Sequence, residues 1–316
     1  MHRTYKLLCA FLALSLVFLV ACATPARETS DVPIVMTTNF PLYDFARAVG
    51  GDAADVRMLL PPSMEAHVYD PSPQDIIAIG HADILLYGGD ALEPWVARLM
   101  PATEGSGVAV VDASQGSAAT GHTHEDEHDH GAYHDEDHAH EHGDDPHIWL
   151  DPHLAEGMVD AVQSALTAAA PEHAALYAAN ADAYREKLEE LDEALTQATQ
   201  NAAHPMLFAG RYAFTHLAER YGLEAIAALD SCGAEAEPSA QRIALMVDTI
   251  KAQNLGFILR EAWDGAKTAD AIAAQTGVKT LVVYGCHNVT RQQLDDGVTY
   301  LELMHENARV LGEVLP

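Results

Sequence analysis

The residues best suited to metal chemistry form one segment, residues 121–145, which reads GHTHEDEHDHGAYHDEDHAHEHGDD. It holds eight histidines and ten carboxylates and has no Lys or Arg. Imidazole is the commonest protein ligand for first-row transition metals, and carboxylates add oxygen donors and negative charge. The segment has almost nothing apolar to bury, so we predict a disordered, metal-binding loop, with a merely solvated acidic linker as the alternative. Its histidines are His122, His124, His128, His130, His134, His138, His140 and His142.

Two of the histidines outside this loop lie in segments that follow predicted strands, and each is flanked by carboxylates. His67 follows Glu65, and His147 follows Asp145 in the segment DPHIWLDP. A neighbouring carboxylate can accept the second ring N–H of a ligating histidine and so fix its tautomer. A single loop histidine is usually only solvated, but two with this pattern are more specific. We therefore predict that His67 and His147 bind a metal, with Glu65 and Asp145 as ligands or as hydrogen-bond acceptors behind the ligands.

The elements that must position these loops alternate between strand and helix. In the first half, strands are expected at residues 33–38, 56–60, 83–87 and 108–111, with helical patterns between them. After residue 204 the alternation returns, with strands at 206–209, 224–229, 256–259 and 280–284. Such alternation indicates parallel sheets with helices on their faces. Ligands of these folds usually bind where loops leave the carboxyl ends of the strands, and the His67 and His147 loops fall there.

A helical region separates the two halves. Apolar spacing is helical over residues 152–170, and a second helical stretch runs from Glu172 to about Gln200. At 1.5 Å per residue this stretch is roughly 45 Å long, which is enough to connect two lobes stiffly. We predict an α/β fold of two lobes with central, mostly parallel sheets, joined by a long rigid helix, with the metal site in the cleft between them. The expected boundaries are a signal peptide at 1–22, a tether at 23–32, a first lobe at 33–155, a helical linker at 156–203 and a second lobe at 204–316.

The net charge of the chain indicates which classes of molecule it can bind. The 316-residue chain has 47 acidic against 17 basic residues, a formal net charge of −30. Nucleic-acid phosphates would be repelled by such a chain, whereas cations would be attracted.

The first 22 residues have the features of an export signal. Arg3 and Lys6 precede an apolar run at residues 7–20, which is too short for a comfortable membrane span. The run ends in Leu-Val-Ala-Cys22, which resembles a bacterial lipobox, in which the cysteine is lipidated. We therefore predict an exported protein held by a lipid at Cys22 on the periplasmic or extracellular face of the cell membrane. A plain secretory signal is the alternative.

Two cysteines remain after the signal region, Cys232 and Cys286. In an oxidising compartment such a pair is most simply a disulfide. Two free thiols and two thiolate metal ligands are the alternatives.

Taken together, the motifs resemble the substrate-binding lipoproteins of zinc and manganese ABC importers. The resemblance covers nearly the whole chain after the signal, and the histidine-rich insertion is typical of the zinc branch. It implies a binding protein rather than an enzyme, a monomer that captures a divalent metal between two lobes and delivers it to a permease served by an ATPase. His67 and His147 match the two first-lobe ligands of that family. The segments that carry the resemblance are EAHVYDPSP from Glu65, DPHIWLDP from Asp145, AERYGL from Ala218 and EPSA from Glu237.

The second half departs from the family pattern at two positions. Arg211 occupies the place of a His or Glu ligand, and a guanidinium cannot ligate a cation. Tyr284 occupies the place of an Asp ligand. His287, three residues later, is our expected second-lobe ligand, and Cys232 with Cys286 is the alternative if both are reduced. Arg211 is expected to pair with Glu235 or Glu237, which leaves a site of three histidines and one water, while His216 is expected to face solvent or the core.

A site of three histidines with few oxygen donors favours zinc as the bound metal, with manganese as the alternative. A secreted zinc hydrolase is a rival interpretation, because three histidines leave an open coordination position. Yet outside the histidine-rich segment the chain has neither a His-Glu-x-x-His pattern nor a nucleophile elbow. A metal-binding adhesin-like lipoprotein is the third interpretation.

Overall fold

The computed structural model describes residues 31–103, 105–120, 145–229 and 237–315. The chain divides into a unit at residues 1–31 and a compact unit at residues 32–316, and only the second is described below. Cys22, Cys232, Glu235 and the eight histidines of the loop lie outside the described residues, so the predictions on them stay predictions. Within the described residues, no helix has the length and apolar content needed to cross a membrane.

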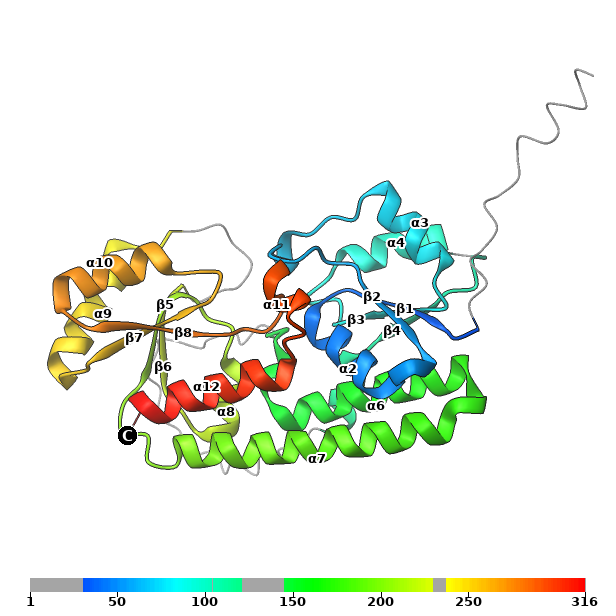
Figure 1. The fold of residues 1–316 in the computed structure, drawn as a ribbon. Helices are drawn as coiled ribbons and strands as arrows, with labels where there is room; N and C mark the ends of the chain where they lie inside the picture. The colour runs from blue at the N-terminus through cyan, green and yellow to red at the C-terminus, as the bar shows by residue number, and fades with distance from the viewer. Residues whose placement is uncertain (1–30, 104, 121–144, 230–236, 316) are drawn as a thin grey trace, which may run out of the picture. The chain divides into compact units, whose positions relative to one another are not determined.

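The first sheet holds four parallel strands in the order β2-β1-β3-β4 (Figure 1). The chain therefore moves outward from β1 to β2 and then crosses back to β3. Loops leaving β1 and β3 point in opposite directions at such a reversal, which creates a crevice at the carboxyl edge. The strands are β1 (Ile34–Thr37), β2 (Asp55–Met58), β3 (Ile84–Tyr87) and β4 (Ala109–Asp112), and the helices are α2 (Phe40–Gly50), α3 (Pro73–His81), α4 (Trp95–Thr103) and α5 (Ser114–Thr120).

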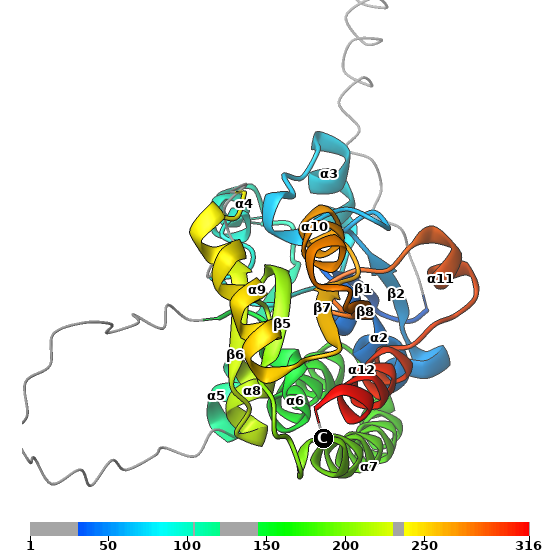
Figure 2. The ribbon, with the colours of Figure 1, turned by 90° about the vertical axis from the view of Figure 1, so that its left-hand side faces the viewer.

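The second sheet repeats this arrangement, with parallel strands in the order β6-β5-β7-β8. Helices α9 and α10 pack against it, as Figure 2 shows. The two sheets confirm the prediction of an α/β fold with two parallel-sheet lobes. The strands are β5 (Met206–Arg211), β6 (Ala225–Leu229), β7 (Phe257–Glu261) and β8 (Lys279–Val283), and the helices are α8 (Thr215–Tyr221), α9 (Ala240–Gln253) and α10 (Ala266–Thr276).

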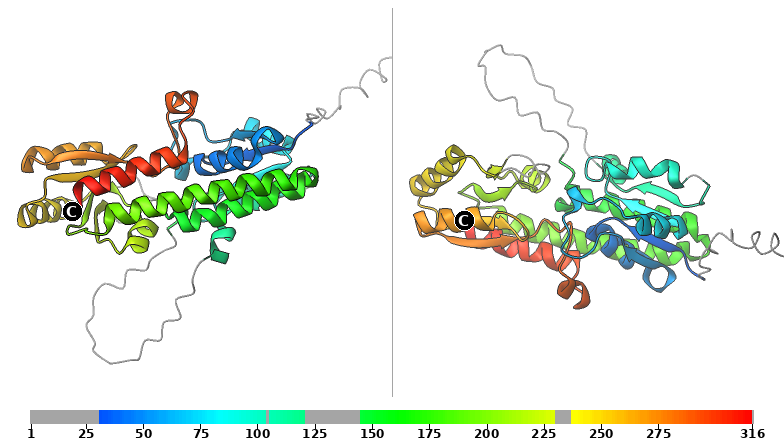
Figure 3. Two further views of the ribbon diagram at one scale, coloured as in Figure 1. Left: turned by 60° about the horizontal axis from the view of Figure 1, so that its bottom comes forward. Right: turned by 90° about the horizontal axis from the view of Figure 1, so that it is seen from above.

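Two long helices, α6 (Pro152–Ala169) and α7 (Ala174–Thr199), lie side by side (Figure 3, green). The buried positions of α7 recur every three or four residues, as an amphipathic helix requires. Tyr177 donates a hydrogen bond to the Ala53 carbonyl and Tyr184 donates one to the Asp44 carboxylate, so α7 is tied to the first lobe. It also packs against the C-terminal helix α12 (Tyr300–Val314). The buried side chains of α7 include Tyr177, Ala181, Tyr184, Leu188, Leu191 and Leu195.

Three details differ from the sequence-based expectation. A short helix, α5, follows β4, where we expected none. Strand β5 continues to Arg211 instead of ending at Ala209, and its pairing with β6 shifts register between Phe208 and Arg211. We expected one long C-terminal helix, but the structure has a separate short helix, α11 (Arg291–Asp295), before α12, because Gly297 turns the chain with φ of 75° and Thr299 then caps α12.

Candidate metal centre

The His67 loop leaves the carboxyl end of β2 and is held by its own short-range contacts. Residues Ala66–Val68 form one 3₁₀ turn, and the Glu65 side chain caps it by accepting from His67 N at 3.4 Å. Ala66 is buried on one side, and the Tyr69 ring packs edge-on against Trp95 at 5.6 Å between centroids. These apolar anchors leave the polar side chains of Glu65 and His67 to line a cavity.

His147 is oriented by Asp145, as the sequence spacing predicts for a ligand and its acceptor. Asp145 Oδ1 accepts from His147 N at 3.0 Å and lies 2.7 Å from His147 Nδ1. A proton on Nδ1 leaves the Nε2 lone pair free for a metal. Burial alone would raise the pKa of Asp145, but the hydrogen bond and the charge of His147 outweigh it and lower that pKa to about 2. Asp145 is therefore a carboxylate that stays ionised.

Asp145 also joins the first lobe to α8 of the second. Its Oδ2 accepts from Thr215 N at 3.3 Å, and its carbonyl lies 2.8 Å from His216 Nε2, which donates to it. His216 thus faces a backbone carbonyl and not, as expected, solvent or the core. Sequence reasoning missed this link because residues 145 and 216 are far apart along the chain.

His287 follows β8 of the second sheet, yet the segment that carries it is hydrogen-bonded to the first lobe. Phe40 N donates to the His287 carbonyl at 3.2 Å. Asn288 Nδ2 donates to the Pro61 carbonyl at 2.8 Å and to the Met64 carbonyl at 2.7 Å. Trp149 Nε1 donates to the Gly285 carbonyl at 2.7 Å. These bonds place the His287 imidazole beside His67 and His147.

The three imidazoles surround a small cavity. Ring centroids are 5.1 Å apart for His67 and His147, and 6.5 Å apart for His287 and each of the other two. The Nε2 atoms of His67 and His147 are 3.1 Å apart. Two imidazole nitrogens on a tetrahedral zinc are about 3.3 Å apart, since each Zn–N bond is about 2.05 Å. The cavity volume of about 20 Å³ is that of a single ion or water.

Protonation also suits a metal site. Burial and the neighbouring His147 lower the pKa of His67 to about 4, so its ring is neutral at pH 7 and can donate a lone pair. His287 is 5% exposed, and its Nδ1 has no hydrogen-bond partner among the described residues. Its Nε2 lies 3.7 Å from Glu65 Oε1. Within the described residues, no group of three or more His, Cys, Asp or Glu side chains is arranged to hold a metal ion.

The wall from the second sheet is formed by Arg211, Ala213, Glu261 and Asp264. Arg211 Nη1 lies 3.8 Å from Glu65 Oε2, and Arg211 Nε lies 3.9 Å from Asp264 Oδ2. Arg211 N donates to Asp264 Oδ2 at 2.8 Å. Among the described residues, Arg211 forms ion pairs with Glu65 and Asp264. We expected Glu235 or Glu237 as its partner, and because Glu235 lies outside the described residues this pairing stays a prediction.

Glu261 is a second wall residue that the sequence analysis missed. Its Oε1 accepts from Gly285 N at 3.1 Å and its Oε2 accepts from Trp263 N at 2.9 Å. It therefore fixes the start of the turn that carries His287. The signal that could have revealed Glu261 and Asp264 was their place directly at and after the end of β7, on the same sheet edge as Arg211.

Tyr284 and Cys286 lie beside the site and do not line the cavity. The Tyr284 backbone is held by Asn307, whose Oδ1 accepts from Tyr284 N and whose Nδ2 donates to the Tyr284 carbonyl, both at 2.8 Å. Cys286 has no disulfide partner among the described residues and is 1% exposed in the apolar core, where burial raises the pKa of its thiol well above the usual range. A protonated thiol is a poor metal ligand. Because Cys232 lies outside the described residues, the disulfide and the paired thiolate ligands stay predictions.

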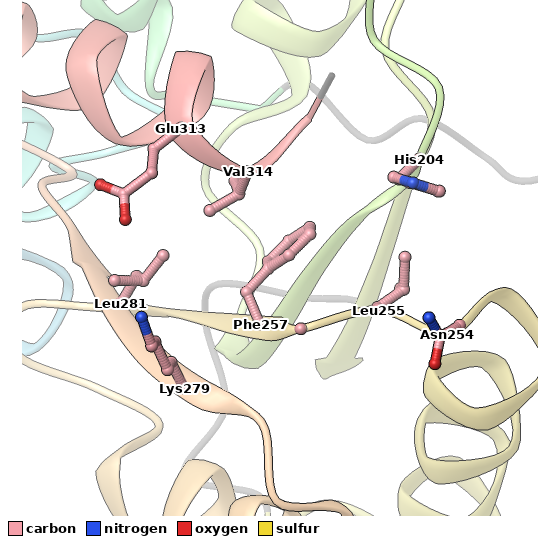
Figure 4. Close-up of a pocket in the computed structure, with 9 residues that line it drawn as sticks. His204, Asn254, Leu255, Phe257, Lys279, Leu281, Glu313 and Val314 are labelled. Atoms are coloured by element: carbon pink, nitrogen blue, oxygen red, sulfur yellow. The ribbon is translucent and has the colours of Figure 1, made fainter.

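Two larger hollows lie at the opposite, amino edge of the second sheet. One, of about 390 Å³, is lined by His204, Phe257, Lys279, Leu281 and Glu313, among others. Figure 4 shows Glu313 and Val314 of α12 facing Leu281 and Phe257 of the strands. The other, of about 460 Å³, shares His204 with it. Neither hollow is lined by His67, His147 or His287.

Comparisons with known proteins agree with this geometry. Residues 35–314 match the family described as zinc-uptake complex component A, periplasmic (ZnuA). The zinc-binding lipoprotein AdcA of Streptococcus pneumoniae is 32% identical over 303 residues, which cover 95% of this chain and 59% of AdcA. The high-affinity zinc uptake system protein ZnuA of Bacillus subtilis is 31% identical over 294 residues, which cover 92% of this chain and 90% of that protein.

A solved structure is also similar, the Zn(II)-bound ZnuA-like domain of Streptococcus pneumoniae AdcA. It superposes with a TM-score of 0.73 at 28% identity, covering 90% of this chain and 99% of that domain. In the sequence comparison with the full-length AdcA protein, by contrast, this chain spans about 59% of the length of AdcA. The match over residues 35–314 includes both lobes and all three histidines of the cavity. The chain therefore belongs to the family of zinc-uptake complex component A (ZnuA) proteins.

Proposed function

We propose that this protein is the extracytoplasmic substrate-binding component of an ABC importer, which captures zinc between two lobes and delivers it to a membrane permease. The observation that carries the proposal is the convergence of His67, His147 and His287 on a cavity of single-ion size. The names of the relatives support zinc as the cargo, because AdcA is called zinc-binding and the Bacillus subtilis protein a zinc uptake protein.

Each histidine has a distinct role in capture. His67 offers a neutral ring because its buried position disfavours the imidazolium. His147 is aimed by the Asp145 carboxylate, which also makes its ring a stronger donor. His287 is positioned by the hydrogen bonds of its backbone and of Asn288 to the first lobe. Three imidazole donors favour zinc over manganese, which prefers more carboxylate oxygens.

The surroundings of the site support cation transport. Glu65, Glu261 and Asp264 line the cavity and Arg211 supplies one opposing charge, so the entrance attracts a divalent ion. We infer transport in preference to hydrolysis, because the family is described as an uptake component. Permease and ATPase subunits are the proposed partners, the protein acts as a monomer, and a lipid on Cys22 holds it at the outer side of the cell membrane. The histidine-rich loop is proposed to collect zinc near the cavity with weak, multiple sites.

The test is a zinc titration in competition with a chelator of known affinity, which isolates the tight site from weak ones. We expect His67→Ala combined with His147→Ala to abolish tight binding. His204→Ala is the matched control, because His204 lines the amino-edge hollows and should leave tight binding unchanged. If the double variant still binds zinc tightly, the tight site is elsewhere in the chain.

A further inference from the structure

The cavity contains a permanent cation, Arg211, at the end of β5. Its side chain is 26% exposed, so the guanidinium is largely withdrawn from water. It lies between two carboxylates, with Nη1 3.8 Å from Glu65 Oε2 and Nε 3.9 Å from Asp264 Oδ2. A guanidinium remains protonated at all physiological pH values and cannot donate to a metal. Arg211 therefore opposes the entry of a divalent cation into the cavity that it lines.

The Glu65 carboxylate lies close both to the Arg211 guanidinium and to the His287 imidazole. One oxygen, Oε2, faces Arg211, and the other, Oε1, lies 3.7 Å from His287 Nε2. Glu65 also precedes His67 by two residues on the same 3₁₀ turn. Three histidines leave one position of a tetrahedral zinc open. Of the cavity's three carboxylates, Glu65 is the one paired with a ligand imidazole, whereas Glu261 is engaged by two backbone N–H groups.

We propose that Arg211 is an internal competitor of the cargo metal: it holds Glu65 while the cavity is free of metal and yields Glu65 to the metal as fourth ligand on loading. This inference rests on the proposed function, because it assigns roles at the same site. Asp264 receives the displaced guanidinium, since it already binds Arg211 N at 2.8 Å. The competition lowers the affinity below that of an uncontested four-ligand site. It also speeds release, because Arg211 recaptures Glu65 as the metal leaves.

Zinc affinity and zinc dissociation rate, measured with a competing chelator, test the role of Arg211. We expect Arg211→Gln to tighten zinc binding about tenfold or more and to slow dissociation, because the competing charge is gone. Arg211→Lys keeps the charge and should stay within about threefold of the wild type. Arg309→Gln removes the same charge from an exposed pair on α12 and should change nothing. Unchanged or weaker zinc binding in an Arg211→Gln protein with wild-type thermal unfolding overturns the proposal.

Two further measurements test the role of Glu65. In a Glu65→Gln background, Arg211→Gln should change zinc affinity by less than about threefold. The Glu65 carboxylate, for which Arg211 and the metal are proposed to compete, is then absent. If Arg211→Gln raised zinc affinity equally with Glu65 and with Gln at position 65, Arg211 would act only by repelling the metal, and the proposed competition for Glu65 would be refuted. The cobalt(II) absorption spectrum reports the ligand set directly and needs no Arg211 variant. It should shift in Glu65→Gln, and an unchanged spectrum would show that Glu65 is not the fourth ligand.

These outcomes are separable from failure of the proposed function. If His67→Ala combined with His147→Ala leaves tight zinc binding intact, the site itself is wrong. If that double variant loses binding but Arg211→Gln shows no gain, the site stands and only the competition by Arg211 fails.

Discussion

Asp145 Oδ1 lies 2.7 Å from His147 Nδ1, while the other oxygen of the same carboxylate accepts from Thr215 N at the start of α8. One side chain thus orients His147 of the first lobe and contacts the second lobe. His147 is 1% exposed, so no solvent can replace the lost acceptor if Asp145 is removed. The tautomer of His147 and its position relative to α8 therefore depend on the same group.

Replacement of Asp145 by Asn should weaken zinc binding. Asn can keep one hydrogen bond to His147, but it lacks the charge that strengthens the imidazole as a donor. Loss of such an acceptor costs about 10- to 100-fold in metal affinity. Chelator competition measures the effect, and Asp270→Asn, on the exposed face of α10, is the control. Wild-type affinity in Asp145→Asn would show that His147 is oriented by other contacts.

Asn288→Ala should loosen the segment that carries His287. Asn288 Nδ2 donates to the carbonyls of Pro61 and Met64, and its loss leaves both acceptors short of a donor. We expect the free energy of unfolding to fall by about 1–3 kcal/mol and zinc affinity to fall with it. Urea unfolding and zinc titration measure the two effects. Asn201→Ala, at an exposed position after α7, should change neither, and an unaltered affinity in Asn288→Ala would mean that the strand β8 alone positions His287.

Acid should destabilise the metal-free protein partly through His67. Burial and the nearby His147 lower the pKa of His67 from 6.5 to about 4 in the folded protein. Between these values the unfolded chain binds a proton that the folded protein does not, so the contribution of His67 to stability is present above pH 6.5 and is lost as the pH falls towards 4. NMR titration of the His67 ring should show a midpoint well below 6.5. His67→Asn should unfold with a weaker pH dependence in this window, and equal slopes would contradict the assigned shift.

Removal of residues 121–144 should separate collection of zinc from tight binding. Because Asp145 orients His147, the deletion must leave Asp145 in place. Titration calorimetry should show loss of several weak zinc equivalents while one tight site remains. A shortened protein with the same number of bound zinc ions would mean that the loop histidines bind none. A deletion that extends through Asp145 should also weaken the tight site, which makes it a useful comparison.

Local patterns in the sequence were enough to predict most of the elements. Strands and helices follow from periodicity and from turn residues, as in the strands near Ile34 and Ile84, because these depend on neighbours along the chain. The pairing of Asp145 with His147 is also local, since two residues of spacing bring the carboxylate to the ring. The family resemblance correctly led to two α/β lobes and to zinc-uptake proteins.

Other features depend on segments that meet only after folding. Nothing near His287 in the chain indicates that Asn288 binds Pro61 and Met64, more than 220 residues away. Likewise, Arg211 meets Glu65 and Asp264 because the carboxyl ends of β2, β5 and β7 converge on one cavity. The sequence by itself therefore determined which residue types are present and the local geometry of the His147 motif. The tertiary structure alone decided which charges share the cavity, because such contacts depend on the packing of distant strands and loops.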